Sequence, residues 1–246
     1  MARIVRTLDK KPLPRYRPND DIRKACYLCG ATEGMTKEHI FARSTFRPND
    51  LEHPVILSAC VRCNAEKEKD EDYANTIFAM TTETESIKDP RKRNFENFAK
   101  RKAREKTDGK VLGLGVHNKI INRLEDVHLV TEKGENLGVG GRFVMDGNRM
   151  KEFYLRIFKG LHTAATGTIC NWNKYEIKFQ FGNITFKEHV NDDAYFYPIN
   201  NAQFVEGWSE HLLFAGLRVE HGTKLVSMWS LALYGEHIAT GSFNEL

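Results

Sequence analysis

The chain has 246 residues, 41% of them hydrophobic, and carries a formal net charge of +4. This apolar content is enough to build a folded core, which excludes an intrinsically disordered chain. No apolar run approaches the roughly twenty residues that span a bilayer, and residues 1–6 are not followed by the apolar segment of a signal peptide. We therefore expect a soluble, cytoplasmic protein of one large or two ordinary domains, without a membrane partner. The mild positive charge permits a polyanionic partner without requiring one.

Residues 1–24 are polar and basic and contain three prolines, Pro12, Pro14 and Pro18. They show neither a helical nor a strand period, and proline disfavours the interior of both structures. We expect them to form an extended N-terminal arm.

Two Cys-x-x-Cys pairs follow the arm, Cys26 with Cys29 and Cys60 with Cys63. Each pair can form a tight knuckle that supplies two thiolates, so the four cysteines predict one tetrahedral zinc site. Gly30 suits the left-handed turn that such knuckles often need. The alternatives are unrelated structural cysteines or two disulfides, but the close spacing within each pair is poor for a disulfide.

Two further features lie within or beside this cysteine frame. Glu38 and His39 form a carboxylate–histidine doublet between the pairs, and Asn64 directly follows Cys63. The combined pattern, over residues 25–80, resembles the HNH endonucleases, the ββα-metal nucleases, in their zinc-stapled form.

The resemblance implies a metal-dependent endonuclease that hydrolyses phosphodiester bonds of DNA, with RNA not excluded. It implies His39 as general base, a role that suits an imidazole, which is unprotonated at cellular pH and can accept a proton. It also implies Glu38 and Asn64 as ligands of a catalytic Mg²⁺ or Mn²⁺. The zinc would be saturated by thiolates and therefore structural.

The sequence departs from the family pattern at two positions. Glu38 stands where aspartate is commoner, which keeps the carboxylate and moves it out by one methylene. The middle asparagine of the family, which supports the loop that carries the histidine, would fall near Val55. This supporting role is therefore unassigned here, and His53 and Asn49 are the candidate replacements.

The same stretch predicts two strands and a helix. We expect strands at 35–40, with Glu38 and His39 near the end, and at 55–57. A helix should run from about 65 to 80, with Asn64 as its N-cap. Acidic side chains in its first turns would suit the helix dipole: Glu66, Glu68, Asp70, Glu71 and Asp72. Alternatively, Asp70 or Asp72 helps to hold the catalytic metal.

Residues 88–110 are rich in lysine and arginine. Phe95 and Phe98 are three residues apart, enough to pin a helix while its cations face outward. Such a run is usually a solvated face, but beside a nuclease motif we expect phosphate contacts. The predicted nucleic-acid-binding residues are Lys92, Arg93, Lys100, Arg101, Lys102 and Arg104.

After Gly109 the composition changes, and we expect a second unit. Strands are predicted at 111–115 and 127–131, with a turn at 133–136. An apolar stripe from Met150 to Leu161 predicts a helix that ends near Gly160. Alternating residues predict a hairpin at 175–186 that turns at 182–183, and then an antiparallel meander at 212–219, 225–234 and 238–243. Cys170, the fifth cysteine, is expected to be a small buried hydrophobe.

The predicted fold class is therefore α+β: an arm at 1–24, a zinc-stapled ββα (HNH) unit with a trailing basic helix at 25–108, and a mixed α+β unit with a mostly antiparallel sheet at 109–246. The third unit would target or regulate a nuclease, with a homo-oligomer or a regulatory partner left open. Two alternatives to the nuclease remain. One is a non-catalytic zinc module that binds nucleic acid, and the other is a sensor or partner-docking protein with a nuclease effector, as in bacterial or phage conflict systems.

Overall fold

The computed structural model describes residue 13 and residues 20–42, 54–81, 125–131, 133–142, 144–183, 204–209, 212–221, 224–234 and 237–246. The chain divides into two compact units, Met1–Lys67 with Lys151–Leu246, and Glu68–Met150. The fold is mixed α+β with antiparallel sheets, as predicted. In these ranges, no helix combines the length and hydrophobicity that a membrane span requires.

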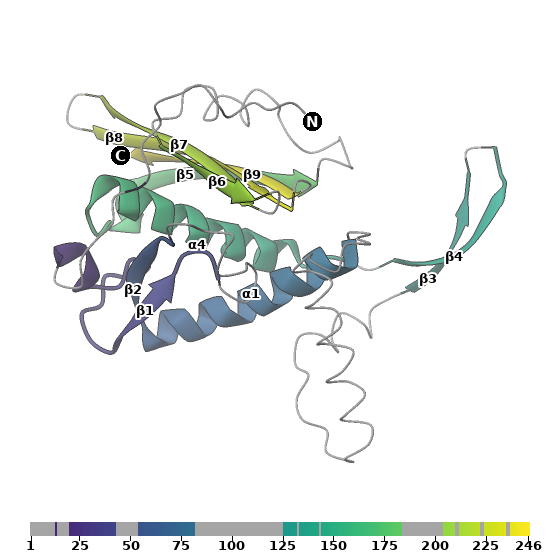
Figure 1. The fold of residues 1–246 in the computed structure, drawn as a ribbon, viewed down its shortest axis with the longest axis horizontal. Helices are drawn as coiled ribbons and strands as arrows, with labels where there is room; N and C mark the ends of the chain where they lie inside the picture. Colours follow the sequence, from purple (N-terminus) through teal and green to yellow (C-terminus); the bar gives the residue numbers. More distant parts are fainter. Residues whose placement is uncertain are drawn as a thin grey trace, which may run out of the picture. The chain divides into compact units, whose positions relative to one another are not determined.

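An antiparallel hairpin followed by a helix contains the cysteine frame. Strand β1 (Met35–His39) pairs with β2 (Ile56–Cys60), in a register that places Met35 opposite Cys60 and His39 opposite Ile56. Strand β2 runs directly into α1 (Val61–Thr81), as Figure 1 shows. The two strands were predicted, although β2 extends three residues further toward the second cysteine pair than expected. This is a ββα arrangement.

Helix α1 begins four residues earlier than the predicted start at 65. Asn64 therefore lies in the first turn and is not the N-cap. The reason is a local hydrogen bond: the backbone N–H of Val61 donates to the carbonyl of Gly34 at 3.0 Å, which satisfies an amide that a capping side chain would otherwise serve. The predicted acidic residues follow the first turn, which contains none.

Before the hairpin, part of the predicted arm is ordered against β2. Residues Asp21–Arg23 form a short 3-10 helix, η1, in which Ile22 is buried. The Arg23 guanidinium donates to the carbonyl of Ile56 at 3.2 Å. The arm was predicted to be extended to residue 24, but its last residues are instead helical, and the 3-10 turn buries Ile22. Residues 1–12 and 14–19 lie outside the described residues.

A five-stranded antiparallel sheet forms most of the C-terminal half. Its strands are β5 (Tyr175–Asn183), β6 (Phe204–Ser209), β7 (Leu212–His221), β8 (Lys224–Leu233) and β9 (His237–Glu245), in the order β5-β9-β8-β7-β6. The predicted meander is confirmed as β7, β8 and β9. The predicted turn at 182–183 is wrong, because Gly182 and Asn183 pair with Ile238 and His237 and continue the strand.

Helix α4 (Gly147–Thr166) lies along this sheet (Figure 1). Tyr154 contacts Phe181, with ring centroids 5.2 Å apart, and Phe158 lies over Gly241. The helix was predicted to end near Gly160, but it continues for six residues. Gly160 has a packing role instead: a Cβ there would lie 2.3 Å from Cδ1 of Ile40, the residue that follows β1. The absent side chain lets the hairpin approach α4.

The unit Glu68–Met150 contains most of α1, a β-hairpin and the start of α4. Strand β3 (Glu125–Val130) pairs with β4 (Asn136–Arg142), which confirms the predicted strand and turn in this region. Arg149 forms an ion pair with Asp70 at 3.2 Å and lies over the ring of Tyr73. Asp70 therefore has a structural partner here. The predicted strand at 111–115 and the boundary at 108–109 lie outside the described residues.

Candidate metal centre

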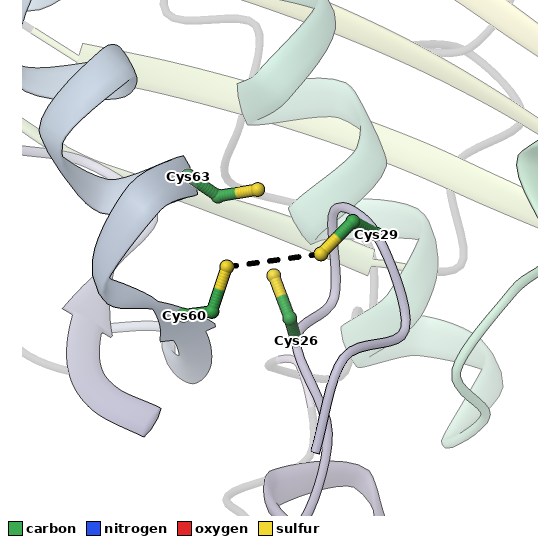
Figure 2. Close-up of side chains that lie close together, drawn as sticks. All are labelled: Cys26, Cys29, Cys60 and Cys63. Atoms are coloured by element: carbon green, nitrogen blue, oxygen red, sulfur yellow. Dashed lines mark hydrogen bonds between the residues drawn. The ribbon is translucent and has the colours of Figure 1, made fainter. Parts of the chain in front are cut away.

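Four cysteine sulfurs meet at the base of the hairpin. The Sγ atoms of Cys26, Cys29, Cys60 and Cys63 all lie within 4.8 Å of one another, and Figure 2 shows the four side chains converging. The Sγ atoms of Cys29 and Cys60 are 3.7 Å apart. A tetrahedral zinc with Zn–S bonds of about 2.3 Å requires sulfurs about 3.8 Å apart. None of the five cysteines of the chain is in a disulfide. The cluster could thus hold one metal ion, and its donor set is compatible with structural zinc.

Backbone hydrogen bonds shape the first knuckle. The N–H of Gly30 donates to the carbonyl of Cys26 at 2.8 Å, and the N–H of Cys26 donates to the carbonyl of Ala31 at 2.7 Å. Gly30 has φ of 77°, which confirms the left-handed conformation expected after the first pair. The turn brings the Cys26 and Cys29 side chains to the same side of the loop.

The end of β2 and the first turn of α1 supply the second pair. Cys60 is the last residue of β2, and Cys63 lies in the first turn of α1. Thr36 of β1 donates its hydroxyl to the carbonyl of Ala59 at 2.9 Å, which adds a side-chain bond to the strand pairing beside Cys60. The strand-to-helix junction therefore fixes the spacing of the second pair.

The four thiols differ in their electrostatic surroundings. Burial raises the pKa of the Cys26 thiol and that of the Cys63 thiol. A hydrogen bond from the backbone of Cys63 lowers the pKa of Cys60 to about 7. The nearby cysteines, Cys63 first, raise the pKa of the exposed Arg62. A bound divalent cation would favour all four thiolates, so metal binding would release protons.

The cysteine frame contacts α4, β7 and a short 3-10 helix, η2 (Trp172–Lys174), that precedes β5. The indole N–H of Trp172 donates to the carbonyl of Tyr27 at 2.9 Å. Ile40 packs on Gly160, and the ring of Phe41 stacks on Phe214 of β7 with centroids 5.1 Å apart. Both Ile40 and Phe41 are buried. The cysteine frame and the C-terminal sheet thus share one core.

Glu38 and His39 occupy the end of β1, beside α1. Glu38 is only 7% exposed, and its Oε1 lies 2.5 Å from Nζ of Lys67 in α1. The same ammonium donates to the backbone carbonyl of His39 at 3.0 Å. His39 is partly exposed as a whole residue, whereas its ring nitrogen Nε2 is buried. Sequence reasoning missed Lys67, whose only signal was its place three residues after Asn64.

Asn64 lies on the same side of α1 as Lys67. Residues three apart on a helix are neighbours on its surface, so the Asn64 side chain belongs to the helix face that Lys67 presents to β1. Asn64 is partly exposed. The ββα arrangement therefore brings the elements that carry Glu38, His39 and Asn64 together, and adds a lysine.

A cavity of about 520 Å³ opens beside the first knuckle. Its lining includes Cys29, Gly30, Lys159, Cys170 and Trp172. The Lys159 ammonium lies 5.2 Å from the centroid of the Trp172 ring, and burial lowers the pKa of that lysine. Cys170 is buried, as expected. The lining of the cavity therefore includes a lysine and Cys29, one of the four cysteines of the cluster.

No family model, curated protein or solved structure matches this chain. The resemblance to HNH endonucleases accordingly stays a prediction that rests on the residues themselves. The predicted nucleic-acid-binding residues Lys92, Arg93, Lys100, Arg101, Lys102 and Arg104 lie outside the described residues, as do His53 and Asn49. Val55, at the position of the missing asparagine, is buried, and its carbonyl accepts a hydrogen bond from the N–H of Ile40 at 3.0 Å.

Proposed function

We propose that this chain is a zinc-stapled nuclease of the HNH type that hydrolyses phosphodiester bonds, with DNA as the expected substrate. One observation carries the proposal: an antiparallel hairpin and a helix hold a four-cysteine cluster at one end and the Glu38–His39 doublet at the end of β1. A cysteine cluster alone would suit any structural zinc module. The doublet beside α1, on which Asn64 also lies, favours a nuclease.

His39 is the proposed general base. A neutral imidazole can take a proton from water at cellular pH. The resulting hydroxide attacks the phosphorus as the P–O bond to the leaving ester oxygen breaks, and that oxygen takes up a proton from solvent. The backbone of His39 is fixed in two ways, by pairing with Ile56 and by the hydrogen bond from Lys67. Fixing the backbone limits the positions that the imidazole can adopt, which favours attack in a defined geometry.

The family resemblance also implies a catalytic Mg²⁺ or Mn²⁺ held by Glu38 and Asn64. The arrangement of Glu38 does not fit that role, because its buried carboxylate already lies against the Lys67 ammonium. Such an ion takes oxygen ligands at about 2.0–2.1 Å and keeps several waters, which a carboxylate that is 7% exposed and paired cannot readily accommodate. We assign no catalytic step to this ion.

The same ion pair favours a second candidate function. If Glu38 serves only to anchor Lys67, the doublet is structural, and the chain is a zinc-stapled module that binds nucleic acid without cutting it. The basic segment at 88–110 would serve either function, through phosphate contacts.

A plasmid assay on the full chain tests the proposal. Supercoiled DNA is incubated with wild type, with His39→Ala and with His128→Ala, each in Mg²⁺, in Mn²⁺ and without added metal. His128 is exposed on β3 and is the matched control. We expect wild type and His128→Ala to cut, and His39→Ala to bind DNA with wild-type affinity but to lose cleavage by about 100-fold or more. Near-normal cutting by His39→Ala would exclude the proposed base, and binding without cutting by wild type would favour the second candidate.

A further inference from the structure

Lys67 and Glu38 form a buried ion pair between α1 and β1. Their side chains are only 3% and 9% exposed, and the Nζ–Oε1 distance is 2.5 Å. Lys67 also donates to the His39 carbonyl, so one ammonium contacts both residues of the doublet. Lysine and glutamate are rarely buried unless they are paired.

The pair has a direct consequence for cation binding. A carboxylate that leaves water needs a compensating charge, and here the charge comes from the chain itself. A divalent ion ligated by Glu38 would lie within a few ångströms of the ammonium, and like charges at that distance repel strongly in a site screened from water. Lys67 and a divalent ion therefore compete for one carboxylate.

We propose that the Lys67 ammonium is the resident cation of this site: it neutralises Glu38, keeps divalent ions from that carboxylate, and positions His39 through the backbone carbonyl. The first two statements concern the ion pair alone, whereas the positioning of His39 rests on the proposed nuclease function. Lys67 is too deeply buried to touch a substrate, so it is a positioning residue and not a catalytic one.

A Mn²⁺ titration of the full, zinc-loaded protein, followed by the electron paramagnetic resonance of free Mn²⁺, tests the ion-pair part. Three proteins are compared: wild type, Lys67→Met, and the uncharged pair Glu38→Gln with Lys67→Met. We expect wild type and the uncharged pair to give the same titration. Lys67→Met should gain a Mn²⁺ site at least tenfold tighter, because it leaves the Glu38 carboxylate without its cation. A Mn²⁺ site that wild type has and the uncharged pair lacks would overturn the proposal.

Folding and activity are measured on the same proteins. Circular dichroism and zinc content show whether each variant is folded, and if Lys67→Met alone fails to fold, the comparison of wild type with the uncharged pair still decides. In the plasmid assay, Lys67→Arg should keep most of the cleavage and Lys67→Met should lose at least tenfold, with DNA affinity unchanged in both. Lys69→Met, at an exposed position two residues away, is the matched control and should cut like wild type.

The two proposals can fail separately. If wild type does not cut DNA, the nuclease function is wrong. If the same protein shows no Mn²⁺ site that depends on Glu38, the proposal that Lys67 is the cation paired with Glu38 is still supported. If wild type cuts DNA and Lys67→Met cuts equally well, the nuclease function stands and the positioning role of Lys67 is overturned.

Discussion

A single methyl group added at Gly160 should loosen the packing of the hairpin on α4. In Gly160→Ala, the new Cβ would lie 2.3 Å from Cδ1, 2.9 Å from Cγ1 and 3.0 Å from Cγ2 of Ile40. Ile40 is fully buried, so its side chain cannot rotate into solvent to relieve the contact. Because Ile40 directly follows His39, the displacement should also reach the proposed base.

Two opposing terms set the size of the effect. Alanine is favoured over glycine inside a helix by about 1 kcal/mol. Overpacking a core typically costs about 1–3 kcal/mol, and a contact at 2.3 Å belongs at the upper end of that range. We expect the free energy of unfolding to fall by about 2 kcal/mol, and the melting temperature by about 4–8 °C for a chain of this length.

Thermal and urea unfolding of five proteins measures the effect: wild type, Gly160→Ala, Gly147→Ala, Ile40→Val and the double variant Ile40→Val with Gly160→Ala. Gly147→Ala, elsewhere in α4, is the control, because its Cβ would meet nothing within 4 Å, and its stability should stay within about 0.5 kcal/mol of wild type. Ile40→Val removes Cδ1, the nearest atom, so the double variant should recover part of the loss, with a coupling of at least about 0.5 kcal/mol. If Gly160→Ala is as stable as Gly147→Ala, or if the two changes are simply additive, the inferred contact is wrong.

Three further predictions concern the zinc content of the chain, the binding of DNA by the basic segment, and the folding of an N-terminal fragment. The purified chain should contain one zinc ion by elemental analysis, and Cys60→Ser should lose both the zinc and order in the hairpin; a zinc-free, folded wild type would contradict this. Neutralising the basic residues Lys100, Arg101, Lys102 and Arg104 should weaken DNA binding for all sequences and flatten its salt dependence; an unchanged salt slope would show them to be a solvated face. A fragment of residues 1–110 lacks α4 and the five-stranded sheet, so Ile40 and Phe41 should be exposed in it. Its circular dichroism spectrum should show little secondary structure, and it should retain less zinc than the full chain. A stable, zinc-loaded fragment would instead support a separate 25–108 domain.

The cysteine cluster could be predicted from the sequence because each pair is a local pattern with its own turn. The left-handed conformation of Gly30 was predicted correctly for the same reason, since Gly30 belongs to a local turn that closes on the carbonyl of Cys26. The antiparallel meander could also be predicted, because its strands show an alternating apolar pattern and clear turn residues separate them.

The errors arose where a distant residue decided the local structure. The sequence predicts Asn64 as the cap because nothing near it reveals that the carbonyl of Gly34 already accepts a hydrogen bond from the first amide of α1. The sequence predicts a helix end near Gly160. The glycine is instead required because a side chain there would collide with Ile40, which lies more than a hundred positions earlier. Lys67 could not be paired with Glu38 across 29 positions by any periodicity.

The place of β9 in the sheet sets the order in which a growing chain can fold. Among the described strands, β5 pairs with β9, which also pairs with β8. Ribosomes add about 5–20 residues per second, so β5 waits roughly 3–12 s after Asn183 is made before Glu245 is available to it. During that interval α4 lacks its contacts with β9, where Phe158 lies over Gly241 and the ring centroids of His162 and Phe243 are 5.0 Å apart. The packing of α4 on the sheet is therefore completed only after β9 has been synthesised.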